Sequence, residues 1–289
     1  MTGEVQYLKL ISRILKKGTL ERGRNGNTRV LIGNQLRFSL ENNTIPIITT
    51  KKMAWDICLK ELLWFIKGDT NNDNLTKDKV KIWNGNSTRE FLDSRGLHHL
   101  KENDLGPIYG FQWRFFNAKY NTCHDDYTGQ GIDQLQNIID ELKDETKRNS
   151  RRLIMTAWNP LQLSEMALPP CHVMSQFHIT NGNELSCTLY QRSGDVGLGI
   201  PFNIASYSFL THLIATHCNL VPKEFVHFIG NAHIYEDHTM SLLRQLHNVP
   251  FEPPKVYIHQ KENINDYDFD DFIVEHYNHH DAIKMDMIV

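Results

Sequence analysis

Several common features are missing from this sequence. It has no run of about 18 apolar residues and no charged stretch followed by an apolar one at its start, so we expect neither a membrane span nor a secretion signal. Its five cysteines are widely scattered, and an odd number without a CxxC pair disfavours a disulfide framework or a structural zinc site. These absences indicate a cytoplasmic protein with reduced thiols and no metal.

An excess of positive charge is also missing. The formal net charge of the 289 residues is −3, so we expect no general attraction to nucleic acid and no membrane partner. An anionic ligand would therefore need a local cluster of arginines. The composition, with 40% hydrophobic and 22% charged residues, is that of an ordinary globular protein long enough to bury a full core.

Hydrophobic periodicity predicts a mixture of helices and strands. A helix is expected from Trp55 to just before Gly68, and a loop is expected over 19–29. Residues 83–130 are expected to be long loops with short helical pieces. The other helices are predicted at 4–17, 131–147, 203–218 and 237–248. The strands are predicted at 30–40, 152–158, 171–180, 184–193 and 224–235, the third and fourth joined by an "NGN" hairpin turn. Because no regular βαβ alternation, repeat or linker is present, we expect one α+β domain over 1–289, with a large mixed β-sheet flanked by helices.

One of the cysteines differs from the rest. Cys171 follows Pro169 and Pro170, whose fixed φ angles and missing N–H groups stiffen the chain just before an apolar strand. A buried, inert cysteine is the common alternative, and it suits the other four. A rigidly held thiol is a candidate nucleophile if a cation lies nearby. His172 is a poor candidate for the activating base, because neighbours in a strand face opposite sides.

The segment "YQRSGDVGLGIPFNIASY" follows a strand with an unusual number of polar and glycine residues for a simple turn. Its Asn203 could be only a helix N-cap, or its amide could donate and accept together at the edge of a uracil-like ring. The other polar residues of this segment are Gln191, Arg192, Ser193 and Asp195.

Arginines and a histidine–tyrosine pair add two further clusters. Arg151 and Arg152 precede a strand, and together with Arg24 and Arg192 they could hold a phosphate, although such a pair is often a solvated corner.

His233 and Tyr235 share one side of a strand, either as a satisfied core pair or as ligand contacts. A metal site built from His227, His233 and His238 is disfavoured by its loose spacing.

Six long motifs together resemble thymidylate synthase. They are "LPPCHVMSQFHI", "LSCTLYQRSGDVGLGIPFNIASY", "GNAHIY", "ELLWFIKGDTN", "DLGPIYGFQWR" and "SRRLIMTAWNP", in the family's order along essentially the whole chain. The segment "YTGQGIDQL" resembles the eukaryotic and large-DNA-virus branch, which for a virus would imply the host cytoplasm. The resemblance implies a thymidylate synthase-like fold that dimerises and an enzyme that methylates dUMP to dTMP. The implied cosubstrate is 5,10-methylenetetrahydrofolate, the donor of one carbon and a hydride, which leaves as dihydrofolate.

The resemblance also implies roles for individual residues. Cys171 matches the nucleophile that attacks C6 of dUMP, and Arg192 matches a residue that contacts phosphate and thiolate and would lower the thiol pKa. Glu61 matches a carboxylate that organises water and helps proton transfer, and its pKa should be shifted. Tyr109 matches a residue assigned to proton removal from C5, and Asn203 matches the residue that recognises the pyrimidine.

Two larger sets are implied as ligand contacts. Arg151 and Arg152 match arginines that reach the phosphate of the other subunit, which implies a homodimer with shared active sites. The residues matched to dUMP are Arg24, Arg151, Arg152, Gln191, Arg192, Ser193, Asp195, Asn203, His233 and Tyr235. The residues matched to the reduced folate are Lys51, Trp83, Asn86, Asp195, Leu198, Gly199, Phe202, Met287 and Val289.

The sequence departs from the family pattern at several positions, and two alternative functions remain open. Asn84 and Asn231 replace acids, the "GRNGNT" loop differs and the tail lacks "PHP", from which we expect altered affinity and not lost activity. One alternative is a pyrimidine deoxynucleotide hydroxymethylase on the same fold, for which a cytosine version would be expected to carry Asp at position 203. The other is a catalytically silent nucleotide- or RNA-binding homologue, against which the retained Cys171, Glu61 and Tyr109 argue.

Overall fold

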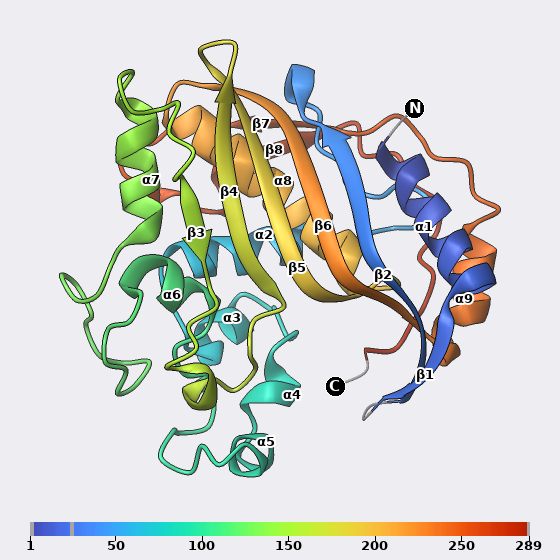
Figure 1. Cartoon of the computed structure of the whole chain (residues 1–289), viewed down its shortest axis with the longest axis horizontal. Helices are drawn as coiled ribbons and strands as arrows, with labels where there is room; N and C mark the ends of the chain where they lie inside the picture. The colour runs from blue at the N-terminus through green and yellow to red at the C-terminus, as the bar shows by residue number, and fades with distance from the viewer. Residues whose placement is uncertain (1–2, 24–25, 288–289) are drawn as a thin grey trace.

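A mixed six-stranded sheet forms the centre of the computed structural model, which describes residues 3–23 and 26–287 (Figure 1). The strand order is β1-β2-β6-β5-β4-β3. β5 and β6 run parallel and all other neighbours are antiparallel. The strands are β1 (Thr19–Gly23), β2 (Gly26–Ser39), β3 (Ile154–Thr156), β4 (His172–Thr180), β5 (Glu184–Asp195) and β6 (Val221–Tyr235). The α+β architecture with a large mixed sheet is therefore confirmed.

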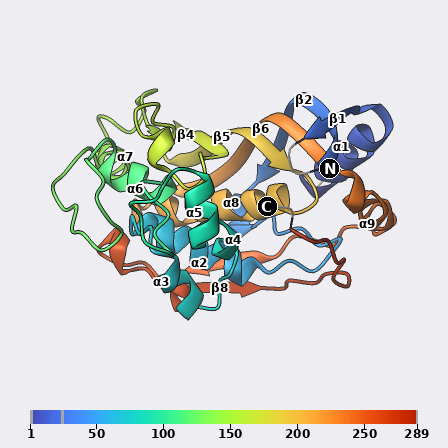
Figure 2. The same cartoon turned by 90° about the horizontal axis from the view of Figure 1, so that it is seen from below.

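Helices cover one face of this sheet in layers. Seen from below, α8 lies directly under the strands, and α2 and β8 lie further out (Figure 2). The main helices are α1 (Gly3–Lys17), α2 (Trp55–Ile66), α7 (Gln134–Lys143), α8 (Gly199–His217) and α9 (Thr239–Gln245). The other helices are α3 (Asn72–Lys77), α4 (Asn84–Ser87), α5 (Arg89–Ser94), α6 (Tyr109–Phe115), η1 (Glu41–Asn43), η2 (Leu163–Glu165), η3 (Glu236–His238), η4 (Ile264–Asp266) and η5 (Phe269–Asp271). A separate two-stranded sheet pairs β7 (Lys255–Ile258) with β8 (Phe272–Glu275).

The central helix α8 is buried on nearly every side, as its apolar sequence predicts. Its internal hydroxyl groups donate to the preceding turn of the same helix, Ser208 to the Ile204 carbonyl and Thr211 to the Tyr207 carbonyl, both at 2.7 Å. These polar groups therefore need no water in the core. Burial of α8 against β5 and β6 fixes its first turn at the lower end of the sheet, where the polar motifs converge.

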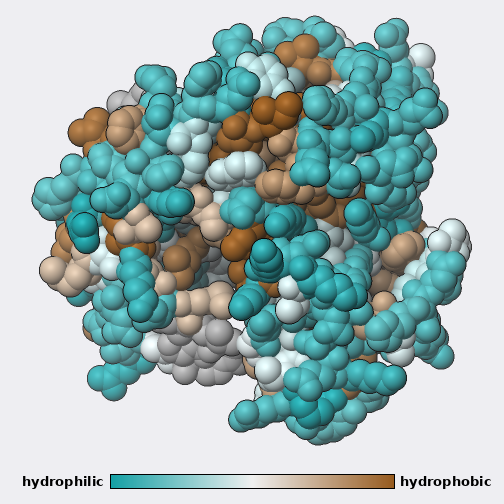
Figure 3. Space-filling model, turned by 180° about the vertical axis from the view of Figure 1, so that it is seen from behind, coloured by the Kyte–Doolittle hydropathy of each residue, from teal (hydrophilic) through white to brown (hydrophobic). Residues whose placement is uncertain are grey.

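No described helix lies over the middle of the other sheet face, which faces the viewer in Figure 1. Met174, Tyr190 and Phe228 lie opposite one another in register on β4, β5 and β6, and they are 37%, 44% and 42% exposed. Ile154 on β3 is on the same face and is also exposed. From behind, by contrast, hydrophilic side chains cover most of the surface, with smaller hydrophobic patches between them (Figure 3). A continuous exposed apolar row on a sheet is typical of a protein–protein contact.

Most predicted elements are confirmed. Helix 4–17 is α1, and the helix that begins at Trp55 is α2. The "NGN" turn joins β4 to β5, with Asn181 and Gly182 at the positive φ angles of 49° and 85° that such a turn requires. Residues 83–130 contain only the short helices α4, α5 and α6 within loops, as expected. Among the described residues, no helix is long and apolar enough to span a membrane.

Some predicted boundaries are wrong. Residues 19–29 are not a loop, because 19–23 form β1 and pair with the start of β2. All five residues of β1 are exposed, so backbone pairing holds this edge strand and no apolar period marks it. The helix expected at 131–147 covers only 134–143, and the strand expected at 152–158 covers only 154–156. The helix expected at 237–248 divides into η3 and α9, and the pair β7–β8 was not predicted.

Candidate active site

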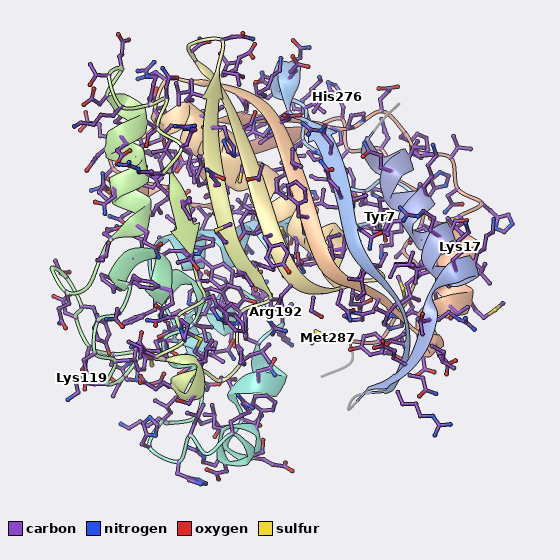
Figure 4. All side chains as sticks on the ribbon, viewed as in Figure 1. Tyr7, Lys17, Lys119, Arg192, His276 and Met287 are labelled. Carbon is purple, nitrogen blue, oxygen red and sulfur yellow. The ribbon has the colours of Figure 1, made fainter. Side chains whose placement is uncertain are left out.

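The polar motifs meet at the lower end of the sheet, where β4 begins and β5 and β6 end (Figure 1). The first turn of α8, the helices α2 and α6 and the C-terminal segment approach the same region. Arg192 lies at the end of β5, and Met287 lies on the C-terminal segment on the same side of the molecule (Figure 4).

Cys171 is held at the start of β4 by contacts on both sides of its peptide. Its backbone N–H donates to the Tyr109 hydroxyl oxygen at 2.7 Å, and its carbonyl accepts from the backbone N–H of Arg192 at 3.0 Å. The Arg192 guanidinium donates to the carbonyls of Pro170 at 2.9 Å and Pro169 at 3.0 Å. It also lies over the Trp158 ring, at 5.6 Å from the ring centre. The proline pair thus stiffens the turn and supplies the carbonyls that anchor the cation.

Burial dominates the acidity of the Cys171 thiol. The pKa of this thiol is raised by burial, while Arg192 and the Tyr109 hydroxyl act in the opposite direction. The predicted cation is therefore present and lowers the pKa as expected, but the expectation of a net lowered pKa is wrong for this structure. The group is a thiol at neutral pH, so attack requires that its proton leave.

Glu61 and Tyr109 lie among aromatic side chains near the thiol. Trp83 donates its indole N–H to Glu61 Oε1 at 2.7 Å. Burial raises the pKa of Glu61 to about 7, although the hydrogen bond from Trp83 acts in the opposite direction. A shifted pKa at Glu61 was the prediction from the sequence. The Tyr109 ring contacts Phe65, Trp83 and His172, and burial raises its pKa well above the usual value.

A buried chain of amide contacts orients Asn203. Gln191 donates its amide N–H to Asn203 Oδ1 at 2.8 Å and to the Ser193 carbonyl at 3.0 Å. The Oε1 of Gln191 lies 2.8 Å from Nε2 of His227. Gln191 and His227 have 2% and 0% of their surface exposed, so water does not compete for these bonds.

A cavity of about 240 Å³ opens between the ends of β1, β2, β5 and β6, and Ser193, His233 and Tyr235 line it. His233 Nδ1 lies 3.1 Å from Asn231 Oδ1. Burial lowers the pKa of His233, while Asp195 opposes this shift. His233 is therefore neutral at pH 7, with its proton on Nδ1 and with Nε2 as an acceptor.

Asp195 ends β5 and is tied to the C-terminal segment through His238. His238 Nε2 donates to the Asp286 carbonyl at 2.8 Å, and its Nδ1 lies 3.8 Å from Asp195 Oδ1. The nearby Asp195 carboxylate raises the pKa of His238. Lys51 is buried beneath this turn, where it donates to the Gly197 carbonyl at 2.5 Å, and burial lowers its pKa to about 8.

The structure brings most of the predicted residues to this end of the sheet, but not all. Arg151 and Arg152 are exposed on the turn before β3, where the Arg151 carbonyl accepts from Gln176, several residues along β4 from Cys171. Arg24 and Val289 lie outside the described residues. Leu198, Gly199 and Phe202 form the start of α8, while Asn86 and the exposed Met287 lie on α4 and the C-terminal segment.

Three residues at this site were not predicted to act in it. Trp158 supports Arg192, His227 contacts Gln191, and His238 contacts the C-terminal segment. For His227 a signal exists in the sequence, because it is a polar residue between Phe225 and Ile229 on the buried face of a strand. Trp158 and His238 carry no comparable signal.

Comparisons with known proteins agree along the chain. A family model described as thymidylate synthase matches residues 5–289. The chain is 51% identical to the human thymidylate synthase, with 99% of this chain and 91% of that protein covered. It is 48% identical to the yeast (Saccharomyces cerevisiae) thymidylate synthase, with 99% and 97% covered. It is 50% identical to a bifunctional dihydrofolate reductase-thymidylate synthase of Paramecium tetraurelia, of whose length the match covers 61%.

Proposed function

Because this chain belongs to the thymidylate synthase family, we propose that it is a methyltransferase that converts dUMP to dTMP in the cytoplasm, with 5,10-methylenetetrahydrofolate as cosubstrate. The observation that carries the proposal is the position of Cys171, held between Tyr109 and Arg192, where Arg192 follows Gln191 of the buried Asn203 network directly in the chain. A nucleophile, a cation and an amide that suits uracil lie on three elements that converge.

Cys171 is the proposed nucleophile toward C6 of dUMP. Its sulfur forms the bond to C6, the thiol proton passes to solvent, and the electron pair of the C5–C6 double bond moves toward C5 and O4. Arg192 favours the thiolate electrostatically and its carbonyl partners hold it in place. Tyr109, whose hydroxyl touches the Cys171 peptide, is proposed to relay the C5 proton: its oxygen takes that proton as the hydroxyl releases its own to solvent.

Glu61 is the proposed group that exchanges protons at the pyrimidine. With a pKa of about 7, it populates both its acid and its carboxylate form at neutral pH. The Trp83 N–H holds one carboxylate oxygen of Glu61, Oε1, in place.

Asn203 is the proposed contact of the pyrimidine edge, and the cavity beside it suits the ribose and phosphate. Its amide donates toward O4 and accepts from N3–H, while Nε2 of His233 accepts from the ribose 3′-hydroxyl and Tyr235 contacts the same group. Ser193 and Arg192 hold the phosphate, together with Arg24.

The residues at the start of α8 fit a flat folate ring. An ideal Cβ at Gly199 would lie 4.0 Å from both Asp195 Cβ and Asn203 Oδ1, so the missing side chain leaves room between a carboxylate and the pyrimidine contact. When bound, 5,10-methylenetetrahydrofolate supplies the one-carbon unit and the hydride. The residues proposed to hold it are Lys51, Trp83, Asn86, Asp195, Leu198, Gly199, Phe202 and Met287, with Val289 at the chain end.

A homodimer with shared active sites is the proposed assembly. The uncovered row of Met174, Tyr190 and Phe228 offers an apolar face for a second copy. Arg151 and Arg152 are exposed and lie away from Cys171 of their own chain, which suits donation to the partner's phosphate.

Absorbance of dihydrofolate during turnover tests the proposed reaction. Protein mixed with dUMP and 5,10-methylenetetrahydrofolate is expected to form dTMP and dihydrofolate in equal amounts. A hydroxymethylase would instead release tetrahydrofolate without this absorbance change, and a silent nucleotide- or RNA-binding homologue would release neither product.

A further inference from the structure

His227 is a buried polar residue of β6 that the proposed chemistry does not use. Its side chain has 0% exposure, and its Nδ1 has no hydrogen-bond partner among residues 3–23 and 26–287. Leu189 pairs with His227 across the parallel strands, so Gln191 lies two residues further along the same buried face. The two side chains meet there at 2.8 Å.

The charge state of His227 determines the direction of this hydrogen bond. Burial, together with the neighbouring His172, lowers the pKa of His227 to about 3, so the ring is neutral at working pH and carries one N–H. The Ser193 carbonyl can accept only from the NH₂ group of Gln191, so Oε1 of Gln191 faces His227. Because Oε1 can only accept, the proton of His227 lies on Nε2. The neutral ring therefore acts as a fixed donor.

Each hydrogen bond in this chain fixes the next amide. With Oε1 of Gln191 held by His227, its NH₂ group points to Asn203 Oδ1 at 2.8 Å and to the Ser193 carbonyl. Asn203 is 8% exposed and must then place its own NH₂ group on the other side. An amide is nearly symmetric in shape, so only such neighbours distinguish its two orientations.

We propose that His227 is a positioning residue that sets the preference for uracil over cytosine, by fixing the orientation of Asn203 through Gln191. This inference rests on the proposed function, in which Asn203 contacts the base. A turned Gln191 would present Oε1 to Asn203 Oδ1, and the repulsion would favour a turned Asn203. The turned amide accepts where it had donated, which matches the amino group of cytosine.

The variant H227F tests this chain because it removes the donor while keeping an aromatic ring. The readout is the ratio of the dissociation constants of dUMP and dCMP, measured by calorimetry. Loss of one neutral hydrogen bond is expected to reduce the preference for dUMP by roughly twofold to tenfold. The conservative variant H227Q, whose terminal amide can donate near the former Nε2, is expected to restore the parent ratio.

A matched control comes from a second buried histidine on α8. His212 is also neutral, with a pKa lowered by burial to about 4, and its Nε2 lies 2.8 Å from the Thr44 carbonyl. H212F removes an equivalent buried donor outside the Asn203 network, so it is expected to lower thermal stability and leave the dUMP:dCMP ratio unchanged. An equal change of the ratio in H212F and H227F would overturn the proposal.

An unchanged ratio in folded H227F would also overturn it. If H227F does not fold, ¹⁵N chemical shifts of histidine-labelled parent protein provide the test, because the proposal requires a neutral His227 with its proton on Nε2. A proton on Nδ1 or an imidazolium ring would contradict it. Failure of the parent to make dTMP from dUMP would instead refute the proposed function, and turnover is measured separately from the binding ratio.

Discussion

Glu61 connects the proposed chemistry to the stability of the fold, and E61Q is the substitution that separates the two. Burial raises the pKa of Glu61 from 4.5 to about 7, so the folded protein holds this proton more tightly than the unfolded chain. The stabilisation that the protonated Glu61 gives the folded state is fully present below about pH 4.5 and is lost as the pH rises through about 7. One pKa unit corresponds to about 1.4 kcal/mol, so the ionised carboxylate destabilises the folded state by up to about 3 kcal/mol above pH 7.

The amide in E61Q stays neutral and can still accept from the Trp83 N–H. We therefore expect E61Q to match the parent near pH 4.5 and to exceed it by up to about 3 kcal/mol at pH 8, while its turnover falls. Urea unfolding at a series of pH values, with turnover measured on the same preparations, is the assay. A constant difference in unfolding free energy from pH 4.5 to pH 8 would refute the reasoning, because it would show that Glu61 titrates alike in both states.

Three further predictions follow from the same site. N203D should lower kcat/KM for dUMP and raise it, relatively, for dCMP. An unchanged ratio would show that the base is recognised elsewhere, since α8 begins at Gly199 and Asn203 therefore lies inside the helix and is not its N-cap. N231D places a carboxylate beside Nδ1 of His233 and should raise the His233 pKa by roughly one unit, as histidine NMR titration can measure. Mixing inactive C171A and R151E chains should recover about one quarter of the parent activity, because half of the dimers are hybrids with one intact site. Sedimentation of an active, strictly monomeric enzyme would rule out that shared site.

The order and type of most elements were predictable because burial leaves a period in the sequence. β1 shows the limit, since an edge strand with five exposed residues carries no such period and is held by backbone pairing with β2. β7 and β8 are four residues each, too short for alternation to distinguish them from loops. Helix α7 begins later than predicted because Asp133 is its N-cap and accepts from the backbone N–H of Gln136.

At the site, the residue types were predictable, but their electrostatics were predictable only in part. The cation beside Cys171 was expected, yet the sign of the net thiol pKa shift depends on how much burial outweighs it, which only the packed structure gives. The predicted shift of Glu61 succeeded because its apolar neighbours on α2 are visible in the sequence. The fixed orientation of Asn203 depends on Gln191 and His227 from two other elements, and no local pattern encodes that meeting.

The central claim is that Cys171 forms the covalent bond to the pyrimidine. Incubation with 5-fluoro-dUMP and 5,10-methylenetetrahydrofolate, followed by mass spectrometry of the digested protein, tests it most directly. We expect one adduct per active site, on the peptide that contains Cys171, and no adduct in C171A. An adduct on any of the other four cysteines, or dTMP formation by folded C171A at more than a trace of the parent rate, would contradict the account.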